Sequence, residues 1–248
     1  MKKKTVVLFI FLLFELYCLF DIFFHLSMIP TPFIQYSAIV FCVVFALWID
    51  RHDIETRWIR IGLLFTLAAD TLLVLIGSFQ TLATLIFIFV QLSYAFRVHQ
   101  NQSISLKFNL LIRFVIILAS ELFIFWLIKS AFDFLVFLSV FYIVNLFING
   151  IFASIKNYNW LFMLGLWLLL ACDILIGLSN AGPYWTFNPQ SLIYRMLHWP
   201  FNLAWAFYIP SQVLLTLSIY FSFKPTSKQR HFNIHPSKMI IFEKEGTS

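Results

Sequence analysis

Two aspartates lie inside apolar stretches of the chain, where a charged side chain is costly. Asp70 occurs in "FTLAADTLLVLIG" and Asp173 in "LWLLLACDILIGL". On membrane-insertion scales a charge at the bilayer centre costs roughly 2.5 to 3.5 kcal/mol, and such residues usually face a cavity, a bundle interior or a partner. Because neither aspartate has a basic residue within a helical turn, we expect both to have a function rather than to complete an ion pair.

Two carboxyl groups in one pocket of low dielectric constant can perform acid–base chemistry. One can keep its proton and act as the acid, while the other stays charged and stabilises a cation or draws in water. Glycosidases flank an oxocarbenium-like transition state with two such groups. Asp70 and Asp173 are therefore the candidate catalytic residues, with the assignment of acid and anion between them left open.

Other apolar segments also carry polar side chains at depth. Taken singly, such a side chain more often holds helices together than binds a ligand. Near the last of them, Pro210 should free a backbone carbonyl, which favours a position beside a cavity. We expect five of these side chains to line a polar pocket and to orient substrate or water: Gln91, Tyr94, Tyr142, Tyr208 and Gln212.

Three further acidic residues lie in apolar segments. We expect structural roles for Glu15 and Asp21, with Asp21 reaching the outer interface of the membrane. Glu121 is left open, because it could pair with Arg113 about two turns away or with an Asn or Tyr of a neighbouring helix.

The composition predicts that these residues belong to a membrane protein. Of the 248 residues, 61% are hydrophobic and only 11% are charged, which is far from the composition of a soluble globular domain. The apolar runs do not alternate with polar residues, as the strands of a membrane β-barrel would. Since a spanning helix needs about 20 mostly apolar residues, the sequence predicts an all-α, polytopic membrane protein.

Eight apolar segments are long enough to be considered as spans. We expect residues 1–222 to form one domain of eight transmembrane helices and residues 223–248 to form a basic cytoplasmic tail. The segments cover about 5–26, 33–49, 59–76, 80–97, 108–128, 131–149, 158–178 and 199–222.

The distribution of basic residues predicts the orientation of the spans. With both termini in the cytoplasm, nearly all Lys and Arg residues fall inside, and only Lys129 and Arg195 fall outside. Arg113 lies slightly within the inner end of its span, where it could snorkel. This distribution indicates a multi-pass protein of a cytoplasmic (inner) membrane. It also explains the net charge of +6 without a nucleic acid partner.

Metal-binding and disulfide patterns are lacking in the sequence. The three cysteines, Cys18, Cys42 and Cys172, lie in apolar runs without metal-type spacing. His231 and His235 could share one face of a helix, but a metal site needs more ligands. We therefore expect no metal and no disulfide framework.

Several of these positions, taken in order, resemble the YhhN-like membrane proteins, a family that includes lysoplasmalogenases. That family has eight spans, a Gly-Asp pair in the third, a His-x-x-Tyr pattern in the following helix, a Ser-Asp pair in the seventh, and an Ala-Gln pair preceded by Tyr in the eighth. The resemblance covers about residues 59 to 222. The matching positions here are Ala69-Asp70, Gln91 to Tyr94, Cys172-Asp173 and Tyr208 to Gln212.

This chain departs from the family pattern at several positions. Gln91 replaces the His, and Thr31-Pro32 replaces a Lys-Pro pair, which removes groups that could move protons or bind phosphate. The resemblance therefore supports the fold more strongly than the activity. The smaller changes are Ala69 for Gly, Cys172 for Ser and Ser211 for Ala.

The resemblance implies hydrolysis of the vinyl ether bond of a lysoplasmalogen, a membrane lysophospholipid. The products would be a fatty aldehyde and a glycerophospho-alcohol. This reaction protonates a vinyl carbon and adds water to an oxocarbenium ion, so it needs an acid and a nearby anion, and it requires no cofactor.

Other functions use the same features. The main alternative is a proton-coupled transporter or a lipid-binding protein, since acidic residues also occur in the first and fifth segments. An intramembrane aspartyl protease would need Gly-x-Gly-Asp, which is absent, and a zinc lipid amidase would need more than His25 and His198 near the membrane. A relative of the family without catalytic activity is the last alternative.

Overall fold

The computed structural model of the chain describes residues 2–100, 105–155, 159–181, 187–199 and 201–221, and within these ranges every regular element is helical. Seven of the described helices are long and apolar enough to cross a membrane, which confirms a multi-pass helical protein. They are α1 (Lys2–Phe24), α2 (Thr31–Trp48), α3 (Ile54–Asp70, continued by the π-helix η1, Thr71–Ile76), α4 (Gln80–Gln100), α5 (Leu106–Ile128), α6 (Phe134–Ile155) and α7 (Trp160–Asn180).

Two helices and a short turn complete the described chain. The helix α9 (Ala204–Tyr220) falls in the eighth apolar segment and has 17 residues, fewer than any of the seven spans. The sequence did not predict α8 (Leu192–Leu197), a helix of six residues between α7 and α9. A 3₁₀ turn, η2 (Lys129–Ala131), joins α5 to α6. The predicted tail, residues 223–248 with His231 and His235, lies outside the described residues.

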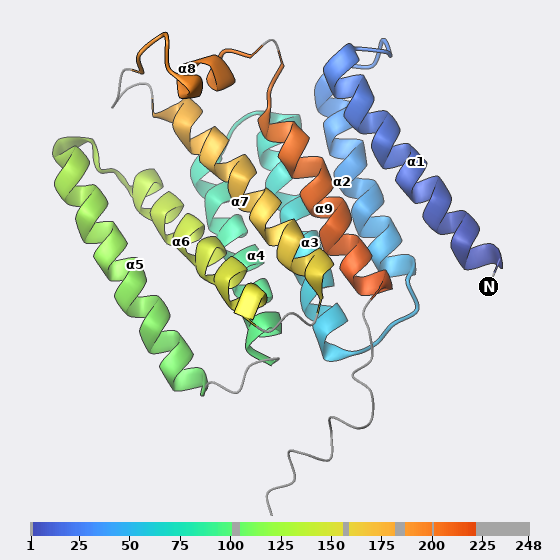
Figure 1. Ribbon diagram of the computed structural model, residues 1–248, viewed down its shortest axis with the longest axis horizontal. Helices are drawn as coiled ribbons and strands as arrows, with labels where there is room; N and C mark the ends of the chain where they lie inside the picture. The colour runs from blue at the N-terminus through green and yellow to red at the C-terminus, as the bar shows by residue number, and fades with distance from the viewer. Residues whose placement is uncertain (1, 101–104, 156–158, 182–186, 200, 222–248) are drawn as a thin grey trace, which may run out of the picture.

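The helices form a bundle in which α7 and α9 lie side by side (Figure 1). The helix α4 packs against both α3 and α6, and α7 packs against α6 as well as α9. The helices α1 and α5 occupy opposite edges of the bundle (Figure 1). Packing contacts link α3 to α9, α9 to α7 and α7 to α6, so residues of these four helices can meet.

Polar residues cap several helices at their N-terminal ends. The side chains of Asp53, Ser105, Asn159 and Ser191 each accept a hydrogen bond from a backbone N–H three residues later. Each bond satisfies a donor that the first helical turn leaves unpaired.

The outer surface is apolar, and Phe114 and Trp126 of α5 are among its most exposed side chains. Such a surface suits contact with lipid.

The cap at Asp53 gives a prediction about stability. Burial raises the pKa of Asp53, but hydrogen bonds from Thr56 and Arg51 lower it by more, so its pKa lies below the usual range. The charged cap therefore stabilises the fold above the pKa of an unfolded Asp, about 4, and this contribution is lost as the pH falls through the lower folded pKa. We expect Asp53→Ala to reduce stability at pH 7 by about 0.5 to 2 kcal/mol.

Thermal unfolding in detergent at pH 7 and pH 3 would measure the effect of the Asp53 cap. Asp50→Ala is the matched control, because Asp50 lies three residues earlier in the same loop with a side chain that is 80% exposed. The difference between the two variants should shrink at pH 3. An equal difference at both pH values would contradict a charged cap.

Candidate functional site

Asp70 is held at the point where α3 changes into the π-helix η1. The hydroxyl of Tyr208, from α9, donates a hydrogen bond of 2.6 Å to Asp70 Oδ2. Asp70 is 3% exposed and Tyr208 is 7% exposed, so this bond is shielded from the surroundings. A hydrogen bond to a charged or acidic group is stronger in such a place than in water.

Asp173 has the same kind of partner from a different helix. The hydroxyl of Tyr142, from α6, donates a hydrogen bond of 2.6 Å to Asp173 Oδ2 on α7. Asp70 and Asp173 are close enough for their charges to repel each other. We call Asp70, Asp173, Tyr142 and Tyr208 the Asp–Tyr cluster. Four central helices therefore supply one residue each to a pair of neighbouring carboxyl groups.

The backbone next to Asp70 is unusual. The π-helix begins at Thr71, directly after the aspartate, and the Gly77 N–H bonds to the Leu72 carbonyl five residues earlier. The Thr71 hydroxyl donates to the Leu67 carbonyl at 2.8 Å, and Tyr36 Oη of α2 lies 3.1 Å from the same hydroxyl. Single π-turns within α-helices occur frequently at functional sites.

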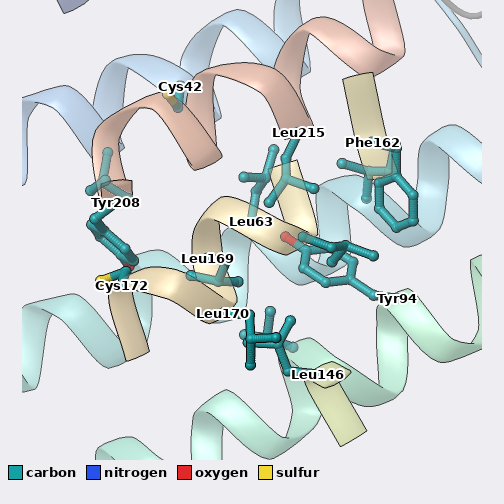
Figure 2. Close-up of a cluster of buried hydrophobic side chains, with 14 of the residues drawn as sticks. Cys42, Leu63, Tyr94, Leu146, Phe162, Leu169, Leu170, Cys172, Tyr208 and Leu215 are labelled. Carbon is teal, nitrogen blue, oxygen red and sulfur yellow. The ribbon is translucent and has the colours of Figure 1, made fainter. Parts of the chain in front are cut away.

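Small residues precede both aspartates in the sequence. Ala69 and Cys172 are buried, and Cys172 lies close enough to both carboxyl groups to interact with them electrostatically. Figure 2 shows Cys172 next to Tyr208 at one end of the buried cluster. A buried thiol behaves as a small, weakly polar side chain. We therefore regard the two carboxyl groups, and not Cys172, as the acids of this cluster.

An apolar pocket of about 230 Å³ lies between α7, α8 and α9, and its lining contains none of the four residues of the Asp–Tyr cluster. Its lining includes Ala171 and Ile174, which flank the Cys172-Asp173 pair, and Phe207, which precedes Tyr208. Met196 lines it from the short helix α8. The lining is almost entirely apolar, so the pocket suits a hydrocarbon chain rather than a polar solute.

The other three predicted pocket residues are not bonded to the aspartates. Within the described residues, Gln91, Tyr94 and Gln212 form no hydrogen bond with either aspartate. Tyr94 packs edge-on against Phe162, with ring centroids 5.7 Å apart, at the other end of the buried cluster (Figure 2). Gln212 is buried on α9 and donates to the adjacent Ser211 hydroxyl at 3.3 Å.

Gln91 belongs to a polar group that the sequence did not predict. The guanidinium of Arg113 on α5 donates to three Asn side chains, those of Asn109, Asn145 and Asn149. Asn149 in turn donates to the side-chain oxygen of Gln91 at 3.1 Å. Arg113 therefore neither snorkels nor pairs with Glu121, as the sequence had suggested it could. The spacing of four residues in Asn109/Arg113 and in Asn145/Asn149 was the signal that could have identified the group.

The two acidic residues of α1 make contacts within and between helices. Asp21 accepts a hydrogen bond of 2.7 Å from the backbone N–H of Ser27, which follows the end of α1. Glu15 is buried and accepts a bond of 3.4 Å from the thiol of Cys42 on α2.

Among the described residues, no three His, Cys, Asp or Glu side chains are grouped so that they could hold a metal ion.

Comparison with known proteins identifies the family of this chain. The family model described as the YhhN family matches residues 4–219. No curated protein and no solved structure matches the chain. The match covers every described helix apart from the first two residues of α1 and the last residue of α9. The chain therefore belongs to the YhhN family.

Proposed function

We propose that this protein hydrolyses the vinyl ether bond of lysoplasmalogens within the membrane. The observation that carries the proposal is the pair of neighbouring carboxyl groups, Asp70 and Asp173, each held by a tyrosine hydroxyl at 2.6 Å. The apolar pocket between α7, α8 and α9 has the character needed for the alkenyl chain. The YhhN family includes lysoplasmalogenases, which agrees with this chemistry.

The proposed reaction uses one aspartate as an acid and the other as an anion. The acid transfers its proton to the vinyl carbon that is not bonded to oxygen, and the resulting positive charge is shared between the other vinyl carbon and the ether oxygen. The anionic aspartate stabilises this oxocarbenium ion and accepts a proton from the water that adds to it. The hemiacetal then loses its hydroxyl proton to the first aspartate while the second aspartate gives its proton to the glycerol oxygen. The bond from the carbon to that oxygen breaks, which releases the fatty aldehyde and the glycerophospho-alcohol and restores both acids.

The tyrosines fix the orientation of the two acids. Each tyrosine hydroxyl occupies one carboxyl oxygen, Oδ2, and within the described residues the other oxygen, Oδ1, has no hydrogen bond. The remaining oxygen of each acid is therefore the one that can transfer a proton or bind water. Positioned acid and base groups of this kind typically accelerate a reaction by about 100- to 10,000-fold.

The proposal includes the orientation of the protein in the membrane. We take α9 as the eighth span, because it is apolar and packs against α7, α2 and α1 within the bundle. Both chain termini then face the cytoplasm, and residues 223–248 form the cytoplasmic tail of an inner-membrane protein. The Asp–Tyr cluster would lie in the middle to outer part of the bilayer.

The decisive experiment is an assay of the purified protein in nanodiscs. The lipid supplied should be a lysoplasmalogen, and the control lipid should be the matching lysophospholipid with a saturated alkyl ether. We expect fatty aldehyde from the first lipid only, because only a vinyl ether can form the oxocarbenium ion by protonation. Absence of aldehyde from folded protein would exclude the hydrolase.

Removal of either tyrosine hydroxyl should slow this reaction without unfolding the protein. Tyr208→Phe and Tyr142→Phe each remove one hydrogen bond to a carboxyl group, which is worth about 1.5 to 3 kcal/mol. We expect at least a 10-fold lower rate of aldehyde release from each variant. Tyr17→Phe is the matched control, because Tyr17 of α1 is 44% exposed, and it should retain the wild-type rate. Equal rates in all three variants would contradict the role of the cluster.

A second candidate function is proton-coupled transport or lipid binding without hydrolysis. It is favoured by Glu15 and Glu121, which are buried in α1 and α5 and lie outside the Asp–Tyr cluster. A transporter can use carboxyl groups distributed in this way to carry protons. Proton-driven lipid uptake into proteoliposomes without aldehyde release would favour this function over the hydrolase.

A further inference from the structure

The group around Arg113 is a buried cation with neutral ligands. Arg113 is 6% exposed, and its Nε, Nη1 and Nη2 atoms donate to the side-chain oxygens of Asn109, Asn145 and Asn149 at 2.8, 3.1 and 2.7 Å. The ring of Phe152 lies on another side, with its centroid 5.6 Å from the guanidinium carbon. Of the five guanidinium N–H groups, three are used in these bonds and two remain.

No acidic residue balances this charge. Among the described residues, no carboxylate lies within ion-pair distance of Arg113. A buried charge normally requires a counter-ion, because leaving it unpaired in a medium of low dielectric constant costs several kcal/mol. Arg97, the other buried arginine of the bundle, differs in this respect, since its Nη2 lies 4.0 Å from Glu55 Oε2.

The same hydrogen-bonded group contains a second side chain with an unpartnered N–H donor. Gln91 is 1% exposed, and its amide nitrogen, Nε2, is buried without a hydrogen-bond partner among the described residues. Its amide oxygen is occupied by Asn149, the same residue that accepts from Arg113. The group therefore contains unused N–H donors from two side chains, together with one positive charge. This combination favours an anion with several acceptor oxygens.

The position of the group relates it to the Asp–Tyr cluster. Tyr142, Asn145 and Asn149 follow one another along one face of α6, at a spacing of three and four residues. With a rise of about 1.5 Å per residue, Asn145 lies about 4.5 Å and Asn149 about 10 Å from Tyr142 along the helix axis. The chain of bonds from the phosphate through the glycerol to the vinyl ether can bridge the shorter of these distances. The helix α5, which carries Arg113, stands at the edge of the bundle (Figure 1), where a lipid can approach from the bilayer.

We propose that Arg113 and Gln91 bind the phosphate group of the lysophospholipid, with Asn145 and Asn149 holding the guanidinium in place. The bound phosphate positions the glycerol so that its vinyl ether reaches the Asp–Tyr cluster. This assignment rests on the proposed function, because it names the part of that substrate that the protein recognises. Arginine suits the role, since its planar donors match the oxygens of a phosphodiester.

The test measures binding with lipids that the protein cannot cleave, so it does not depend on catalysis. Two saturated ether lipids with the same chain, an alkyl lysophospholipid and an alkylglycerol without phosphate, are titrated against the protein in nanodiscs. We expect the phosphate-bearing lipid to bind about 10- to 100-fold more tightly to the wild type. In Arg113→Gln this preference should disappear. Lys107→Gln, an equal change of charge at an exposed position of the same helix, should retain it.

Further arms of the experiment identify the source of the phosphate and guard against misfolding. Inorganic phosphate should compete weakly with the alkyl lysophospholipid, and strong competition would instead assign the site to free phosphate.

If Arg113→Gln does not fold, Gln91→Met removes the unpaired donor without touching the bonds of Arg113, and the preference should fall several-fold. A wild type without the preference, or folded Arg113→Gln with the full preference, would overturn the assignment. Either result would leave the hydrolase assay unaffected.

Discussion

Replacing Asp70 or Asp173 with asparagine is expected to lower the rate of lysoplasmalogen hydrolysis by roughly 100- to 10,000-fold. Asparagine has nearly the same shape as aspartate, but it can neither donate the proton nor carry the negative charge. Its amide oxygen can still accept the hydrogen bond from Tyr208 or Tyr142, so the fold should survive. The loss therefore reports chemistry rather than packing.

The comparison of single and double variants makes this prediction sharper. Since the two acids act on one transition state, Asp70→Asn with Asp173→Asn should be little worse than either change alone. The rates are measured as initial release of fatty aldehyde from protein in nanodiscs. Asp133→Asn is the matched control, because Asp133 accepts a bond from the Val136 N–H, which an asparagine oxygen can also accept. Full activity in both single variants would exclude the Asp pair from catalysis.

Gly62→Ala should be the most destabilising single-methyl substitution in the contact between α3 and α4. A Cβ atom at Gly62 would overlap Cε1 of Tyr94 and lie 2.9 Å from its Cζ, which is far inside van der Waals contact. Tyr94 is fully buried and packs against Phe162, so its ring has little freedom to move aside. We expect a loss of about 1 to 3 kcal/mol in the free energy of unfolding.

Denaturation in detergent would measure this loss, and a second change should reverse part of it. Replacing Tyr94 with leucine removes the ring that clashes, so Gly62→Ala should cost less in the Tyr94→Leu background than in the wild type. Gly177→Ala is the matched control, because a Cβ there meets nothing within 4 Å, and the better helix propensity of alanine should leave stability unchanged or higher. Equal stability of Gly62→Ala and wild type would show that the helices can separate.

The sequence was sufficient to predict the helical membrane architecture and the family. Long apolar runs have few other solutions in a bilayer, because the backbone must satisfy its own hydrogen bonds there. The observed helices reproduce the first seven apolar segments with shifts of up to six residues at their ends. The short helix α8 was missed, since six residues between breaker-rich loops carry no periodic signal.

The arrangement of side chains inside the bundle was only partly predictable. Asp70 and Asp173 were conspicuous because each is acidic in an apolar run, but their partners Tyr208 and Tyr142 come from helices distant in the sequence. Packing between helices decides such pairings, and it leaves no local pattern. The same reason applies to Gln91, whose observed partner Asn149 comes from α6.

The π-helix after Asp70 has a consequence for how this part of the molecule can change. Each residue of a regular helix turns the chain by about 100°, and a π-turn accommodates one residue more than the α-helix around it. Deleting a single residue between Thr71 and Ile76 would restore a continuous α-helix and rotate the segment beyond Asp70 by about that angle. The direction of the segment from Thr71 to Gly77 therefore depends on the π-helix, whereas Asp70, the last residue of α3, is placed by the α-helix before it.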